Sequence, residues 1–123
     1  MNKIYKKLIY PYQTINNFKP FLYRVGLSDI IKSRVKYDYS VNQNFRYNMK
    51  NKNSMVKQDE VLCSIYNLDL DLCYLFYTPY NGQLVNINYP ILHNIDNIIE
   101  NNEIDNWLFD IKIQIPYVYN TYS

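Results

Sequence analysis

Two aspartates, Asp69 and Asp71, are the residues whose type and spacing are best suited to chemistry. They alternate with Leu68 and Leu70 between two apolar runs, so two carboxylates separated by one residue lie in a predicted turn. Two nearby carboxylates can hold a cation or work as a general acid and base. No third ligand is adjacent, however, and a turn offers no pocket. We therefore predict an acidic, solvated turn, with no catalytic residue and no metal site.

The other reactive side chains support no further site. Cys63 and Cys73 lie on the two arms of a predicted hairpin; they either form a disulfide across it or stay reduced in the strand core, which is commoner without a secretory signal. No Cys-x-x-Cys pair is present, so zinc and redox motifs lack support. His93, the only histidine, has no nucleophile pattern around it, and we expect it on the surface of a helix.

The elements that position these residues are predicted to be mainly β-strands. Apolar runs at 61–66 and 72–77 flank the acidic turn at 67–71. In a second turn at 78–82, Asn81-Gly82 supplies the positive φ angles of a tight hairpin. Downstream we predict a strand with Leu84, Val85 and Ile87, a helix over 91–101 with Ile95, Ile98 and Ile99 on one face, and a strand over 107–113.

The upstream half begins with a predicted strand at 23–27. Ser28 then caps a helix over 28–36, in which Ile30, Ile31 and Val35 share a face. Residues 48–54 are predicted to form a polar, basic loop. The alternation as a whole predicts two antiparallel sheets packed around a core that comprises Val61, Ile65, Leu75, Val85, Ile87, Leu108, Phe109 and Ile111.

The stretch 77–112 resembles the core of the glycine cleavage system H protein family, a lipoyl carrier that shuttles an aminomethyl group between enzymes. Tyr77, Pro79 and Gly82 match the family's Tyr-x-Pro-x-x-Gly turn, and Trp107-Leu108-Phe109-Asp110-Ile111-Lys112 matches its Trp-Leu-Phe-x-Ile-Lys ending. Val25-Gly26-Leu27-Ser28-Asp29 is similar to its Val-Gly-Ile-Thr-Asp. The resemblance covers residues 23–113. It implies a mainly β, lipoyl/biotinyl-type barrel-sandwich with short peripheral helices and extended N- and C-terminal segments.

The chain departs from the family where the cofactor would be attached. The family places its lipoylated lysine eight residues before the proline of the turn, and counting back from Pro79 reaches Asp71. The Glu-Ser-x-Lys context is also absent, and no lysine occurs between Lys57 and Lys112. An amide-linked arm needs a lysine amine, because the cofactor carries the chemistry and the protein only positions it. We expect no lipoyl group and no other cofactor.

Charge is distributed unevenly along this single-domain chain of 123 residues. Residues 1–57 hold twelve of the thirteen basic residues and two acids, a net charge of +10, whereas residues 58–123 carry a net charge of −8. Either the basic part faces a polyanion such as RNA or an acidic protein surface, or the two halves pair with one another.

Three segments follow from these observations: a basic N-terminal arm at 1–22, an H-protein-like domain at 23–113 and a tyrosine-rich extended tail at 114–123. The arm lacks acids, a secretory apolar region and a membrane-spanning stretch, and its composition is that of a mitochondrial targeting segment. The candidate partner-binding residues are Lys3, Lys6, Lys7, Lys19, Arg34, Arg46, Lys50, Lys52, Tyr117 and Tyr119.

The function we expect is that of a non-enzymatic, non-lipoylated structural subunit of a larger mitochondrial assembly, without a small-molecule substrate. A mitochondrial ribosome is favoured, since the basic half is suited to rRNA, and a respiratory-chain complex comes next. One alternative is a docking or regulatory partner in glycine cleavage or lipoate metabolism. Another is a small independent RNA-binding module.

Overall fold

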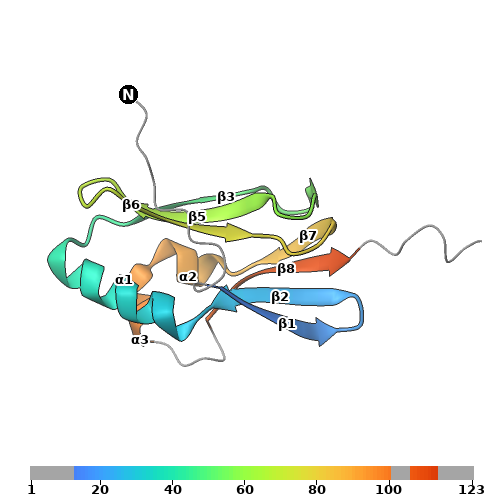
Figure 1. The fold of residues 1–123 in the computed structure, drawn as a ribbon, viewed down its shortest axis with the longest axis horizontal. Coiled ribbons are helices and arrows are strands. Elements are labelled where there is room, and N and C mark those ends of the chain that lie inside the picture. Colours follow the sequence, from blue (N-terminus) through green and yellow to red (C-terminus); the bar gives the residue numbers. More distant parts are fainter. Residues whose placement is uncertain (1–12, 101–105, 114–123) are drawn as a thin grey trace, which may run out of the picture.

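Two antiparallel sheets face each other in the described part of the protein (Figure 1). The computed structural model describes residues 13–100 and 106–113. The five-stranded sheet has the order β1-β2-β8-β7-β4 and the three-stranded sheet the order β3-β5-β6. The strands are β1 (Gln13–Lys19), β2 (Leu22–Leu27), β3 (Arg46–Met49), β4 (Met55–Val56), β5 (Val61–Asn67), β6 (Leu72–Tyr77), β7 (Gly82–Ile87) and β8 (Trp107–Ile113). The prediction of a mainly β fold with two antiparallel sheets is confirmed.

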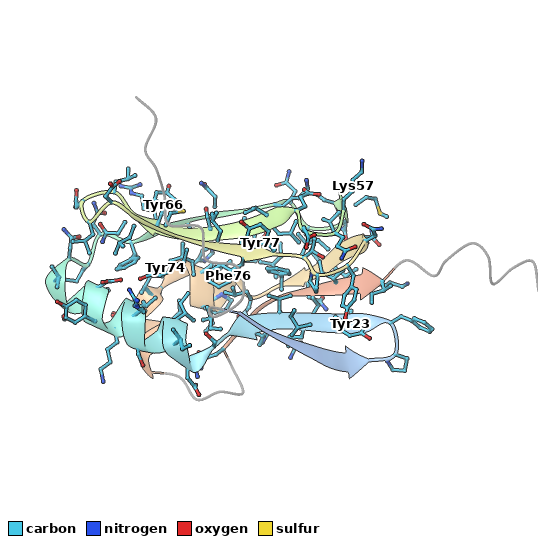
Figure 2. The ribbon with its side chains drawn as sticks, in the orientation of Figure 1. Tyr23, Lys57, Tyr66, Tyr74, Phe76 and Tyr77 are labelled. Atoms are coloured by element: carbon cyan, nitrogen blue, oxygen red, sulfur yellow. The ribbon has the colours of Figure 1, made fainter. Side chains whose placement is uncertain are left out.

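The core lies between the two sheets and under the helices, which gather at one end of the molecule (Figure 1). Figure 2 shows Tyr74 and Phe76 pointing from β6 into this space. Of the predicted core residues, Ile65, Leu108, Phe109 and Ile111 are fully buried, and Leu75, Val85 and Ile87 are half-buried.

Val61 was wrongly predicted as a core residue, since it is 40% exposed. The register of β5 against β6 shifts between Val61 and Cys63, and such an irregularity changes which side chains of the strand face inward. Leu62 and Cys63 are buried there instead. A similar shift in β7, between Leu84 and Asn86, places Leu84 in the core.

Helix α1 (Asp29–Val41) begins where Ser28 caps it, with the Ser28 hydroxyl accepting a hydrogen bond from the Ile31 amide at 3.4 Å. The helix extends five residues beyond its predicted end at residue 36. Ile31 and Val35, one turn apart, are buried as predicted. Ile30 was predicted to share their face, but it is 52% exposed because neighbouring residues on a helix point about 100° apart.

The helix predicted over 91–101 is instead two short helices, α2 (Tyr89–His93) and α3 (Ile95–Glu100). The backbone of Asn94 between them is extended, with φ −139° and ψ 105°, which ends α2. The Asn94 side-chain oxygen then accepts a hydrogen bond from the Asp96 amide at 3.1 Å. Ile95 and Ile98 are buried as predicted. The loop predicted over 48–54 begins later than expected, after Met49, because β3 includes Asn48 and Met49.

Gly82 does not have the positive φ angle that a tight Asn-Gly hairpin would require. It is the first residue of β7 and lies opposite Ile113 of β8 and Val56 of β4. A Cβ atom at residue 82 would lie 2.2 Å from the carbonyl oxygen of Lys112. The glycine is therefore required by the close approach of the β8 backbone, and the prediction based on turn geometry was wrong.

Candidate functional site

The tip of the β5–β6 hairpin is where the family resemblance places a carrier lysine. Residues Leu68, Asp69, Leu70 and Asp71 form the turn, as predicted. The Asp71 amide donates a hydrogen bond to the Leu68 carbonyl at 3.2 Å, and Asp71 has a left-handed φ of 55°. Aspartate tolerates this conformation better than most residues. Lys57 lies at the other end of the molecule (Figure 2).

Asp69 is held by the segment that follows α1. Its carboxylate accepts hydrogen bonds from the side-chain amides of Asn42 and Asn44, both at 3.1 Å. These two amide nitrogens orient the Asp69 carboxylate, but they add no negatively charged ligand for a metal ion. Among residues 13–100 and 106–113, no group of three or more His, Cys, Asp or Glu side chains is placed to hold a metal ion.

Asn67, which was not among the predicted site residues, organises this tip through its side-chain hydrogen bonds. It is fully buried, and its amide nitrogen lies 3.2 Å from both the carbonyl oxygen and the side-chain oxygen of Asn42. Its own side-chain oxygen accepts from the amides of Asp69 and Leu70 at 3.1 and 3.2 Å. An asparagine that binds the backbone two residues on is typical of a turn, and that was the available sequence signal.

Replacing Asn67 with alanine is expected to lower the free energy of unfolding by about 2 kcal/mol, because backbone amides of the tip and the Asn42 carbonyl lose buried partners. Asn44→Ala removes one exposed hydrogen bond and is the control, with an expected cost below about 1 kcal/mol. Urea unfolding of both variants measures the difference. Equal stabilities for the two would show that the buried amide does not hold the tip.

Cys63 and Cys73 are both free and buried. Cys63 lies opposite Phe76, and Cys73 opposite Tyr66, so the two thiols are not cross-strand partners. Burial raises the pKa of the Cys63 thiol, and the neighbouring Cys73 adds to this; burial also raises the pKa of Cys73. The reduced state, one of the two states left open by the sequence, is the one in the structure.

We expect iodoacetamide at mildly alkaline pH to modify neither cysteine of the native protein, because thiolate is the reactive form and both thiols resist ionisation. Both should react once urea unfolds the chain. Intact mass spectrometry over time measures the number of adducts. Rapid modification of the native protein at Cys63 would contradict the buried position.

Two ion pairs join the basic half of the chain, residues 1–57, to the acidic half, residues 58–123. Arg24 of β2 binds Asp110 of β8 through Nε at 2.8 Å and Nη2 at 3.1 Å, and its guanidinium lies 4.1 Å from the Trp107 ring centroid. Lys50 forms an ion pair with Glu60, and this hydrogen bond holds the pKa of Glu60 below its ordinary value. Some of the pairing between halves that the sequence left open is therefore present.

Other basic side chains remain available on the surface. Arg34, Arg46 and Lys52 are exposed, and no ion pair joins them to another residue in the described part of the chain. The backbone of Lys19 lies in β1. The remaining predicted partner-binding residues, Lys3, Lys6, Lys7, Tyr117 and Tyr119, lie outside the described residues, as do most of the predicted arm and the tail.

The outer face of α1 combines apolar and basic side chains. Ile30, Tyr37 and Val41 are 52%, 70% and 59% exposed, and Arg34 lies on the same face one turn from Ile30. The spacing of four, three and four residues aligns these positions along the helix. Contiguous exposed apolar side chains of this kind are typical of a surface that another molecule covers.

His93 is exposed at the end of α2, as predicted. Its ring lies 5.6 Å from both the Tyr47 and Tyr89 ring centroids. Nothing in the sequence spacing indicated this cluster, because Tyr47 is far from His93 along the chain.

None of the helices in residues 13–100 and 106–113 has the length and apolar character needed to cross a bilayer.

The described residues form a sandwich of two small antiparallel sheets with short helices. A glycine cleavage system H protein from Mycobacterium marinum has a similar structure, with a TM-score of 0.61 and 13% sequence identity over 89% of this chain and 82% of that chain. No family model and no curated protein sequence matches the chain. The likeness shows the fold and confirms that part of the resemblance found in the sequence.

Proposed function

We propose that this protein is a non-enzymatic, non-lipoylated structural subunit of a larger mitochondrial assembly, with the mitochondrial ribosome favoured and a respiratory-chain complex next. The observation that carries the proposal is the outer face of α1, where Ile30, Tyr37 and Val41 are exposed around Arg34. A free monomer gains nothing from exposing these side chains, whereas a subunit buries them against a neighbour.

The hairpin tip supports the non-carrier part of the proposal. The turn presents Asp69 and Asp71 and has no amine to which a lipoyl group could be amide-linked. Asn42, Asn44 and Asn67 tie the tip to the segment after α1. The mitochondrial location rests on the acid-free, basic composition of residues 1–22.

The test is sedimentation of the full chain, isolated under native conditions at physiological salt. We expect it to sediment with a large particle and to have the mass of the unmodified polypeptide. A free monomer would overturn the structural role, and a lipoyl or biotinyl adduct would overturn the non-carrier role.

The double variant Ile30→Ser/Tyr37→Asp should weaken association with the particle by about tenfold, because apolar anchors dominate interface energies. Lys36→Gln is the control, as it removes a charge from a different side of the same helix and should leave association within about twofold. If both variants remain fully bound, α1 is not the interface.

The likeness to an H protein favours a second candidate, a docking or regulatory partner in glycine cleavage or lipoate metabolism. Such a partner would compete with a true carrier for the carrier's enzymes. A pull-down with glycine decarboxylase and aminomethyltransferase tests it, and the absence of retention on both would dispose of it.

A further inference from the structure

A pocket of about 470 Å³ opens between the end of α1, strands β3 and β5, and the junction of α2 and α3. Its aromatic walls come from Tyr39, Phe45, Tyr47, Tyr66 and His93. Tyr66 lies toward the hairpin-tip end of β5 (Figure 2). Ligand pockets typically measure about 300–1,000 Å³, so this one suits a single small planar group with its substituents better than a folded peptide element.

The rings of the pocket form two groups. Tyr39 and Phe45 are stacked, with ring centroids 6.4 Å apart and an interplanar angle of 26°. Tyr47 and His93 form the second pair, with ring centroids 5.6 Å apart and the rings tilted by 39°. Rings held against each other in this way stay in place, and they offer flat apolar surface to a planar ligand at small entropic cost.

The polar side chains of the pocket favour an anion. Arg46 is exposed, and its side chain has no ion pair or hydrogen bond within the described residues; its backbone pairs with Tyr66 in the β3–β5 register. No carboxylate is among the described residues that line the pocket. Gln43 and Asn94 also line the pocket. The Gln43 side-chain nitrogen donates to the Tyr39 carbonyl at 2.6 Å, and the Asn94 side-chain oxygen accepts from the Asp96 amide, so the Gln43 side-chain oxygen and the Asn94 side-chain nitrogen are the groups left to bind the edge of a base.

We propose that this pocket binds one unstacked nucleotide of a single-stranded RNA, with its base against the aromatic walls and its phosphate at Arg46. Sequence-tolerant stacking on aromatic rings, together with a guanidinium at the phosphate, is how single-stranded nucleic acid is held. The inference deepens the proposed function, on which it rests, because it names the kind of molecule that the basic half would meet in a ribonucleoprotein.

The test measures binding of a short fluorescein-labelled single-stranded RNA to the full chain by anisotropy, alongside NMR titration with AMP, adenosine and inorganic phosphate. AMP should shift the backbone signals of Phe45, Arg46 and His93. Arg46→Gln should weaken RNA binding about fivefold, and His93→Ala about tenfold. Lys36→Gln, which also removes one positive charge but lies outside the pocket and away from the α1 face around Arg34, should stay within about twofold. Circular dichroism shows that each variant is folded.

Equal losses for Lys36→Gln and Arg46→Gln would indicate non-specific electrostatic attraction and overturn the pocket. Binding of an acidic tyrosine-containing peptide without binding of RNA or AMP would also overturn it, in favour of a protein partner. The proposed function fails separately. If the chain binds AMP in this pocket but sediments alone, the pocket is supported and the structural role is overturned. If it sediments with a large particle but does not bind AMP or RNA, only the pocket is overturned.

Discussion

Gly82→Ala is expected to lower the free energy of unfolding by about 3 kcal/mol or more, because the new methyl group meets backbone instead of a movable side chain. The added Cβ would lie 2.2 Å from the Lys112 carbonyl oxygen and 3.0 Å from Cγ2 of Ile111. Gly82 lies between β8 and β4, so separating β7 from β8 to relieve the clash disturbs pairing on both sides. Urea unfolding monitored by Trp107 fluorescence measures the loss.

Lys112→Ala is the matched control, since it alters the exposed side chain of the residue whose carbonyl the new methyl group would meet and leaves that carbonyl in place. Its expected effect is within about 0.5 kcal/mol. A stability of Gly82→Ala close to that of the unsubstituted chain would mean that the two strands separate there at little cost, and that this glycine is not required by the sheet.

The second large effect is expected for Asp110→Ala, at about 3 kcal/mol. Asp110 is fully buried, whereas the side chain of its partner Arg24 is 22% exposed. The Asp110 carboxylate also accepts a hydrogen bond from the Asn86 amide at 3.0 Å, so one side chain links β2, β8 and β7. Removing it leaves a mostly buried guanidinium without its counter-ion, which is the costly way to break such a pair.

The double variant Arg24→Met/Asp110→Leu separates the value of the pair from the cost of a lone charge. It should recover much of the lost stability, because both charges are gone and apolar groups fill the space. Asp29→Ala is the control, an 83% exposed aspartate 3.8 Å from Lys32, with an expected cost below about 1 kcal/mol. A double variant less stable than Asp110→Ala would show that the charged pair is itself strongly favourable.

Local patterns predicted β2, β5, β6, β7, β8 and the acidic hairpin tip, because alternation and turn composition act over a few residues. Strands β1, β3 and β4 were not among the predicted elements. The pair of runs on either side of the tip became β5 and β6, and Ser28 capped α1. The reading of Val61 as core and of Ile30 as buried failed. In the first case a register shift, and in the second the helical period, placed the neighbouring residue inward.

Features that depend on contacts between distant segments could not be predicted. Gly82 looked like a turn glycine, but its role comes from Lys112, thirty positions away. Asn67 holds the tip through Asn42, and the candidate RNA pocket is lined by both Arg46 and His93. The missing lysine was evident from the sequence, whereas the asparagine side chains that fix the tip required three-dimensional information.

Strand β8 lies between β2 and β7 in the five-stranded sheet, although it is the last described strand along the chain. During synthesis, one edge of β2 and one edge of β7 therefore stay unpaired until residues 107–113 emerge, because both of these edges pair with β8. Pairings of such long sequence separation form slowly, and open edges invite association with other chains. A nascent chain that stalls before Trp107 would thus depend on chaperones to remain soluble.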